Sequence, residues 1–252
     1  MTNRQIILRT LDDLLKPESF KDYGPNGLQV EGVTEIQKIV TGVTASQALI
    51  EAAIKEKADA LLVHHGLFWR GQDGRVTGWL RQRLALLLSN NINLFAYHLP
   101  LDAHPEVGNN VQLGELLGWK TLSYFGDQNL GCIGVSVSSD SCQSVFALAE
   151  KLEAKLRRIV IRVEGDGRAI KKIAWCTGGA QNYFEAAVAA GADVFVTGEI
   201  SEPQAHLARE TGVAFLACGH HATERYGVQA VGMRLVNTFG IEHIFIDIDN
   251  PA

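Results

Sequence analysis

The chain has 252 residues, of which 46% are hydrophobic and 20% charged, values typical of a globular protein with one large or two small domains. A net charge of −5 argues against strong, sequence-independent binding to nucleic acid, which requires clustered lysine and arginine. No apolar run approaches the roughly 20 residues that span a bilayer, and the N-terminus does not read as a secretory signal, so we expect a soluble, cytoplasmic protein without membrane contact.

Helix-like and strand-like segments alternate along the first half of the chain. An amphipathic helix is predicted at residues 4–16, and residues 22–32 form a turn-rich segment punctuated by Pro25, Asn26 and Gly27. The further elements predicted here are strands at 38–44, 58–63 and 92–98 and helices at about 46–57, 79–90 and 109–118.

The same rhythm restarts near residue 119. Strands are predicted at 131–137, 157–163, 171–177, 193–198, 213–218 and 243–248, and helices at 141–156, 182–191, 201–211 and from about 221. Because parallel strands need crossovers of about this length, the alternation predicts an α/β fold with mostly parallel sheets flanked by helices.

Two pairs of segments suggest an internal duplication. "KIVTGVTAS" is similar to "KIAWCTGGA", and "ADALLVHHG" is similar to "ADVFVTGEI". In each pair the segments occupy the same place in the helix–strand alternation. A duplicated α/β unit would explain both similarities.

Histidines and carboxylates collect where predicted strands end. Six of the eight histidines fall in three such junctions. Ligands of open α/β sheets bind outside the carboxyl ends of the strands, so these junctions are the place to expect a site. The junctions contain His64 and His65; His98, Asp102 and His104; and His220, His221 and Glu224.

The adjacent pair His64 and His65 has two interpretations. The simpler one is a strand that ends and turns into solvent. Neighbouring side chains of a regular strand point to opposite faces, so the two imidazoles could not reach one ion. At a strand exit followed by Gly66, however, they could approach two ions that lie close together, provided that carboxylates from elsewhere share those ions.

At the junction near residue 220, the sequence does not decide which histidine would be the ligand. On a helix that begins near residue 220, both His220 and His221 share a face with Glu224, at spacings of four and three residues. A plain helix N-terminus, favoured by Thr223 and Glu224, is the alternative. Spacing alone does not distinguish the two histidines.

The donor set of the junctions consists of imidazole nitrogens and carboxylate oxygens. The four cysteines form no C-x-x-C pair, and we expect Cys132, Cys142, Cys176 and Cys218 to be reduced, mostly buried thiols. A set of nitrogen and oxygen donors suits Zn²⁺, Mn²⁺, Fe²⁺ or Ni²⁺ and leaves positions for water. Carboxylates that bridge two ions are typical of two-metal hydrolases.

Two further strand ends could face the same cavity. The Gly-rich stretch at 176–181 could offer backbone N–H groups to an anion, and Thr197 and Glu199 follow the strand at 193–198. Ordinary Gly-rich turns are the alternative for both. Neither a G-x-G-x-x-G nor a Walker pattern occurs, so the sequence gives no support for a dinucleotide site or a P-loop.

An ordered set of motifs resembles one known family. These motifs are "DYGPNGLQVEG", "VTGVTAS", "LLVHHGLFW", "YHLPLDAHPEVGNN", "CTGGA", "FVTGEIS" and "GHHATERYG". Together they resemble the GTP cyclohydrolase I type 2 / Nif-three-like family, above all its bacterial YbgI-like members, from about residue 20 to the C-terminus. The resemblance is weakest at 119–170.

The resemblance implies an architecture and an assembly. It implies two interlinked α/β domains, a metal-binding one at 1–120 plus 213–252 and a second at 121–212. It also implies a dinuclear site of two divalent metal ions in each subunit, and a toroidal homohexamer built as a trimer of dimers.

The resemblance also implies roles for individual residues. The family's metal ligands correspond to His64, His65, Asp102, His220 and Glu224, which favours His220 over His221. His98 matches a motif position, and we predict that it supports the ligands or transfers protons.

The implied function is a hydrolase that opens the imidazole ring of a purine nucleotide such as GTP, by attack of metal-bound hydroxide on C8 and loss of formate. Two alternatives stay open. One is phosphoester hydrolysis at the same ions, and the other is a ring-shaped metal-binding scaffold without turnover.

Overall fold

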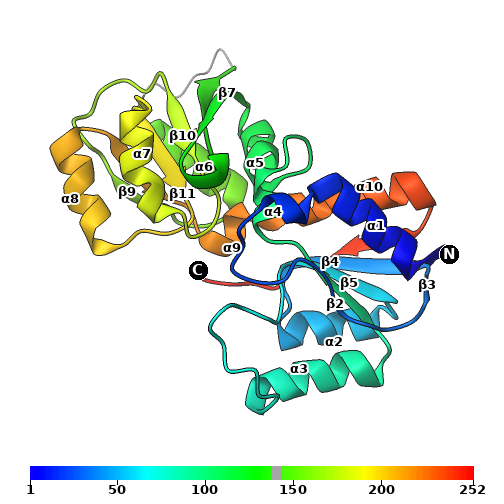
Figure 1. The fold of residues 1–252 in the computed structure, drawn as a ribbon. Coiled ribbons are helices and arrows are strands. Elements are labelled where there is room, and N and C mark those ends of the chain that lie inside the picture. The colour runs from blue at the N-terminus through cyan, green and yellow to red at the C-terminus, as the bar shows by residue number, and fades with distance from the viewer. Residues whose placement is uncertain (138–143) are drawn as a thin grey trace. The chain divides into compact units, whose positions relative to one another are not determined.

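The computed structural model describes residues 1–137 and 144–252, and these divide into two units. Unit 1 comprises Met1–Val107 and Gly227–Asp249, and unit 2 comprises Gly108–Tyr226 and Asn250–Ala252. Figure 1 traces the chain through both. Each unit is a sheet flanked by helices, which confirms the predicted α/β class. The domain limits given above, at residues 120 and 212, stay a prediction; the structural units change at 107 and 226.

Unit 1 contains a five-stranded sheet in the order β13-β4-β5-β6-β2. The pairs β13–β4, β4–β5 and β5–β6 are parallel, and β2 runs antiparallel to β6. The central strands β4 and β5 are buried along most of their length because both faces of the sheet are covered. Their bounds are β2 (Gly27–Val30), β4 (Lys38–Thr44), β5 (Ala60–His65), β6 (Asn93–Ala96) and β13 (Glu242–Phe245).

Helices cover both faces of this sheet, as Figure 1 shows. On one face lie α1 (Arg4–Leu15) and α10 (Arg225–Phe239), and on the other lie α2 (Gln47–Lys55) and α3 (Gly78–Ser89). The periodicity of α1 buries Ile7, Leu11 and Leu15, spaced four residues apart. Its N-cap residue Asn3 accepts a hydrogen bond from the amide of Gln5 at 2.9 Å.

Unit 2 contains a six-stranded sheet in the order β7-β8-β10-β11-β12-β9. Its central strands β10, β11 and β12 are parallel, and the outer strands are antiparallel to their neighbours, so the sheet is mixed. The bounds are β7 (Trp119–Phe125), β8 (Gly131–Ser136), β9 (Ile161–Val163), β10 (Ile173–Trp175), β11 (Val194–Thr197) and β12 (Ala214–Ala217).

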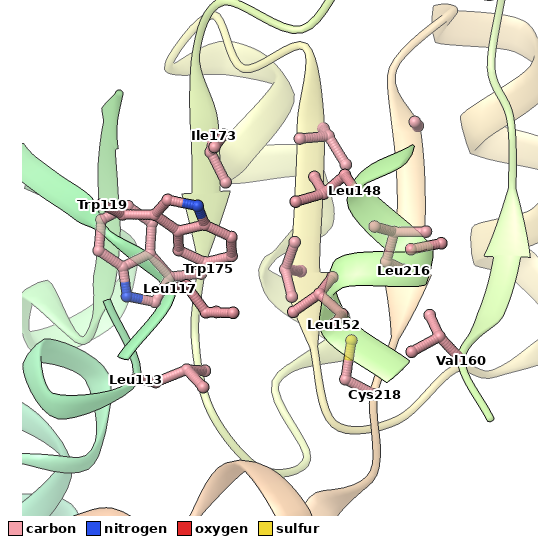
Figure 2. Packing of buried hydrophobic residues seen from close by; sticks show 14 of the residues in the cluster. Leu113, Leu117, Trp119, Leu148, Leu152, Val160, Ile173, Trp175, Leu216 and Cys218 are labelled. Atoms are coloured by element: carbon pink, nitrogen blue, oxygen red, sulfur yellow. The ribbon is translucent and has the colours of Figure 1, made fainter. Parts of the chain in front are cut away.

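The helices of unit 2 are α5 (Asn109–Leu117), α6 (Val145–Leu156), α7 (Phe184–Ala189), α8 (Glu202–Thr211) and α9 (His220–Thr223). Figure 2 shows Leu148 and Leu152 of α6 packed with Trp175 and Leu216 of the sheet. The predicted start of this helix at residue 141 lies outside the described residues, and the helix begins at Val145.

Smaller elements complete the two units. A short antiparallel pair joins β1 (Thr2–Asn3) to β3 (Glu35–Ile36), and α4 (Leu99–Ala103) follows β6. Three 3-10 turns are η1 (Pro17–Ser19), η2 (Asp127–Asn129) and η3 (Gln181–Tyr183). Among the described residues, Cys132, Cys176 and Cys218 are buried thiols that form no disulfide, and Cys142 lies outside the described residues. In the same part of the chain, every helix is too short or too polar to cross a membrane.

The same hydrogen bonds recur at matching positions of the two units. The Asp59 carboxylate accepts from the amide of Lys38, at the start of β4, and from the residue before it, at 2.9 and 2.7 Å. The Asp193 carboxylate accepts from Lys172, directly before β10, and from the residue before it, both at 2.8 Å. Asp59 directly precedes β5, and Asp193 directly precedes β11. This shared arrangement supports the internal duplication that the sequence similarity predicts.

Candidate metal centre

In unit 1, imidazoles gather at the carboxyl ends of β5 and β6. The prediction ended this strand at residue 63, but β5 continues through His64 and His65. Their ring centroids are nevertheless only 4.6 Å apart. His98 follows the neighbouring strand, and its ring centroid lies 5.0 Å from that of His64 and 5.7 Å from that of His65. Each of the three offers a ring nitrogen within 4.8 Å of the others, close enough to hold a metal ion.

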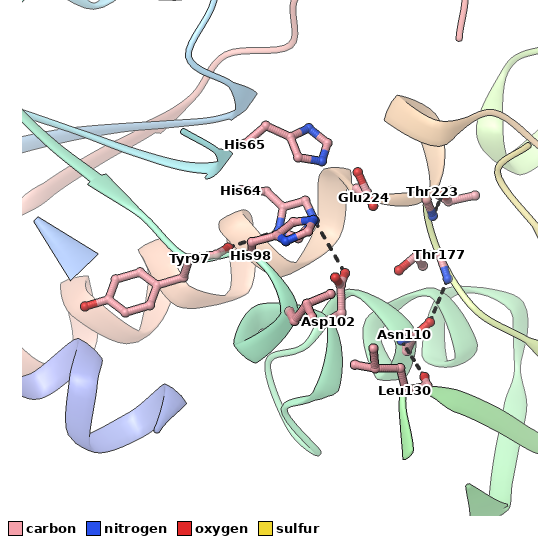
Figure 3. A network of polar contacts seen from close by, with 12 residues as sticks. His64, His65, Tyr97, His98, Asp102, Asn110, Leu130, Thr177, Thr223 and Glu224 are labelled. Atoms are coloured by element: carbon pink, nitrogen blue, oxygen red, sulfur yellow. Dashed lines mark hydrogen bonds and ion pairs between the residues drawn. The ribbon is translucent and has the colours of Figure 1, made fainter. Parts of the chain in front are cut away.

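The tautomer of His64 is set by the backbone. Its Nδ1 lies 3.0 Å from the carbonyl oxygen of Tyr97. Because a carbonyl only accepts, Nδ1 must carry the hydrogen, and the lone pair is on Nε2. Nε2 lies 3.5 Å from Oδ1 of Asp102, a buried residue of α4 (Figure 3). Metal-binding histidines commonly donate one ring N–H to a carbonyl in this way, which fixes the ring and leaves the other nitrogen to bind the ion.

His98 is held from behind by a carboxylate that sequence reasoning missed. Its Nδ1 lies 2.6 Å from Oδ1 of Asp22. Burial raises the pKa of Asp22, but the contacts with His98 and with the amide of Asn26 outweigh burial and hold that pKa below its usual value. Asp22 therefore remains a carboxylate that fixes the imidazole. Its only signal in the sequence is its place at the head of the turn-rich segment at 22–32.

Unit 2 contributes a second cluster, made of His220, Glu224 and Glu199. Nε2 of His220 lies 3.2 Å from Oε2 of Glu224, and Nδ1 lies 2.6 Å from Oε1 of Glu199. Burial lowers the pKa of His220, but the two carboxylates more than offset this and raise it to about 9. The spacing left His220 and His221 open as partners of Glu224, and these distances pair Glu224 with His220.

The Gly-rich stretch at 176–181 packs against the side chain of Glu224. A Cβ atom on Gly178, whose φ is +69°, would lie 2.0 Å from Oε1 of Glu224. The Gly178 amide donates to the hydroxyl of Thr223 at 3.0 Å, and its carbonyl accepts from the hydroxyl of Thr197 at 3.1 Å. The amide of Thr177 donates to Asn110 at 2.8 Å (Figure 3). The first amides of this stretch are thus used inside the unit, so they do not form the anion seat that the sequence suggested.

The described residues therefore include clusters of histidine and carboxylate side chains that could hold a metal ion. A model of the Duf34/NIF3 (NGG1p interacting factor 3) family matches residues 2–251. The chain belongs to this family. The predicted resemblance is confirmed, and the α/β fold described above is the fold of this family.

Relatives and solved structures match over nearly the whole chain. The "GTP cyclohydrolase 1 type 2 homolog" of Neisseria meningitidis is 50% identical over 252 residues, 100% of each chain. The protein of the same name from Pseudomonas aeruginosa is 50% identical and covers 98% of this chain and 97% of its own. Among structures, protein ybgI, of unknown function, has a TM-score of 0.94 at 44% identity, with 100% of each chain covered. TTHA1606 from Thermus thermophilus has a TM-score of 0.90 at 32% identity, again with 100% of each chain covered.

Proposed function

We propose that this member of the family is a metal-dependent hydrolase that opens the imidazole ring of a purine nucleotide. The observation that carries the proposal is the cluster of His64, His65 and His98, in which each ring offers a nitrogen within 4.8 Å of the others; we propose the first two as metal ligands and the third as the proton-transfer group. The names of the relatives, which call them homologs of a GTP cyclohydrolase, suggest the reaction.

The donor chemistry of the described residues fits divalent ions. The donors are imidazole nitrogens and carboxylate oxygens, and the tautomer of His64 directs its Nε2 lone pair away from the backbone. We propose that the protein binds two ions of the Zn²⁺, Mn²⁺, Fe²⁺ or Ni²⁺ class. The proposed ligands are His64, His65, Asp102, His220 and Glu224.

Bound ions would act as Lewis acids and lower the pKa of a water to about 7. Ring opening then adds water across the C8–N9 bond of the purine, and a second water releases C8 as formate. N9 must gain a proton when its bond to C8 breaks. We assign that proton transfer to Nε2 of His98, which takes the proton that the attacking water gives up and passes it to N9, while Asp22 orients the imidazole through Nδ1 at 2.6 Å.

The deciding experiment combines metal analysis with product analysis. Native protein is assayed for metal by elemental analysis and then incubated with GTP. Formate release supports ring opening, release of inorganic phosphate supports phosphoester hydrolysis instead, and a metal-loaded protein that leaves GTP unchanged refutes the proposed reaction.

Variants separate the metal site from the fold. Asp102→Asn should lose bound metal and activity together. Asp73→Asn is the matched control, because Asp73 is an exposed carboxylate of unit 1 paired with Arg75. If Asp102→Asn keeps the metal content of the parent, the proposed ligand set is wrong.

We further propose a cytoplasmic homohexamer, a toroidal trimer of dimers. This is the assembly that the family resemblance of the sequence implies. Sedimentation velocity of the purified chain tests it, because a hexamer and a dimer differ threefold in mass. A scaffold without turnover would show the hexamer and the metal but no product.

A further inference from the structure

A hollow of about 320 Å³ lies beside the imidazole cluster of unit 1. It is lined by the loop before β2 and by the loop after β5, through Asp22, Tyr23, Gly24, Pro25, Phe68, Trp69 and Arg70. This volume falls at the lower end of the range of small-molecule sites. Of its lining residues, only Asp22 belongs to the site described so far.

The two loops that form the hollow are joined by hydrogen bonds. The amide of Arg70 donates to the carbonyl of Tyr23 at 2.6 Å, and the Arg70 guanidinium donates to the carbonyl of Asp22. A Cβ atom on Gly24 would lie 2.5 Å from the carbonyl oxygen of Phe68, so only glycine permits this approach. The loops thus form a fixed frame around the hollow.

Aromatic rings link the hollow to His98. The Trp69 ring meets the His98 ring edge-on, with centroids 5.0 Å apart, and the Tyr23 ring lies 6.1 Å from it. Trp69 also lies 5.9 Å from His65. A second, smaller cavity shares Phe68 and Trp69 with the hollow and reaches His98. A molecule in the hollow would therefore lie against Trp69, whose ring contacts the imidazole of His98.

The side chains of the hollow define the chemistry of its occupant. Tyr23 is 60% exposed although it is a large aromatic residue, and Trp69 and Phe68 remain partly exposed beside it. Aromatic faces of this kind stack on planar rings such as nucleobases. Arg70 adds an exposed cation at the rim, which suits a phosphate.

We propose that this hollow is the substrate-recognition subsite, where Tyr23 and Trp69 stack on a purine base and Arg70 pairs with the attached phosphate. The purine rests on the proposed function, whereas a preference for a planar, anionic ligand follows from the hollow itself. Tyr23, Trp69 and Arg70 would then determine specificity without binding metal.

Calorimetry on the full-length, metal-analysed protein tests this subsite with guanosine monophosphate and with ribose 5-phosphate, which lacks the base. We expect Trp69→Ala and Tyr23→Ala to weaken binding of the nucleotide about tenfold, since loss of one base–aromatic stack corresponds to a factor of roughly 5 to 150. Trp69→Phe should restore most of the affinity. Ribose 5-phosphate should bind weakly to all of these proteins.

Trp79→Ala is the matched control, because Trp79 is a 52% exposed tryptophan of α3 outside the hollow. It should bind as the parent does. Arg70→Gln should reduce the preference for the monophosphate over guanosine. All variants should retain the metal content of the parent and a cooperative thermal transition, which shows that they are folded.

The outcomes separate this inference from the proposed function. Nucleotide binding that depends on Trp69 and Tyr23, without turnover, refutes the reaction and supports the subsite. Turnover with binding that is indifferent to Trp69→Ala and Tyr23→Ala overturns the subsite and leaves the reaction intact. Equal affinity for guanosine monophosphate and ribose 5-phosphate also overturns it.

Discussion

Gly178→Ala is the sharpest test of how the fold positions Glu224. Gly178 has a φ of +69°, and an added Cβ would lie 2.0 Å from Oε1 of Glu224 and 3.2 Å from Nε2 of His220. The left-handed conformation costs an alanine about 1–2 kcal/mol. Displacing the buried Glu224 carboxylate from His220 costs about a further 1.5–3 kcal/mol, the value of a hydrogen bond to a charged group. We expect a total loss of about 2.5–5 kcal/mol in the free energy of unfolding.

Two other glycines provide matched controls. Gly167 has a φ of +77° with open space around its Cβ position, so Gly167→Ala should lose only about 1–2 kcal/mol. Gly179 has ordinary contact distances of 3.4 Å or more, so Gly179→Ala should be close to neutral. Urea denaturation of the metal-free proteins measures all three. The reasoning is refuted if Gly178→Ala loses no more than Gly167→Ala.

Three further predictions concern the rest of the fold. Asp59→Ala and Asp193→Ala should each lose about 1–3 kcal/mol in urea denaturation, because each leaves two backbone amides without their acceptor; a loss confined to one of them would contradict the proposed repeat. Burial lowers the pKa of His243, so the unfolded chain binds the proton more readily and stability should fall as pH drops below about 6.5. His243→Gln should make that decline shallower, and an unchanged pH profile would exclude this cause. Burial raises the pKa of the Cys132 thiol to about 12, so in a Cys142→Ser background it should react with iodoacetamide only when the protein unfolds; labelling of the native protein at pH 8 would show otherwise.

The sequence alone was sufficient to predict the parallel strands and the position of the histidines at their ends. The β-branched run at 38–44 coincides with β4, and the apolar run that ends at His64 and His65 belongs to β5. These strands are buried on both faces, so their pattern is strong and local. Since parallel strands end at one edge, the clustering of His98 with the pair follows from the strand order.

Elements defined by their partners were harder to predict. The segment at 22–32 was interpreted as turns, yet Gly27–Val30 forms β2, a four-residue strand that depends on its pairing with β6. Trp119–Phe125 was assigned to no element, because β7 exposes several consecutive side chains and shows no alternation. Asp22 was missed for a similar reason, since its partner His98 is 76 residues away. Contacts of this kind leave no periodic signal in a single sequence.

The two units use one backbone arrangement to present different chemistry. In unit 1 the amide of Tyr97, directly after β6, donates to the carbonyl of Val63 in β5 at 3.1 Å. In unit 2 the amide of Cys218, directly after β12, donates to the carbonyl of Thr197 in β11 at 2.7 Å. The ends of these strands therefore correspond in the two units. Just beyond these points, unit 1 holds Nδ1 of His98 against Asp22, and unit 2 holds Nδ1 of His220 against Glu199, both at 2.6 Å. The supporting carboxylates come from different places: Asp22 lies before β2, whereas Glu199 follows β11. The imidazole–carboxylate pair therefore occurs near the corresponding strand ends of both units, although the supporting carboxylate comes from a different element in each.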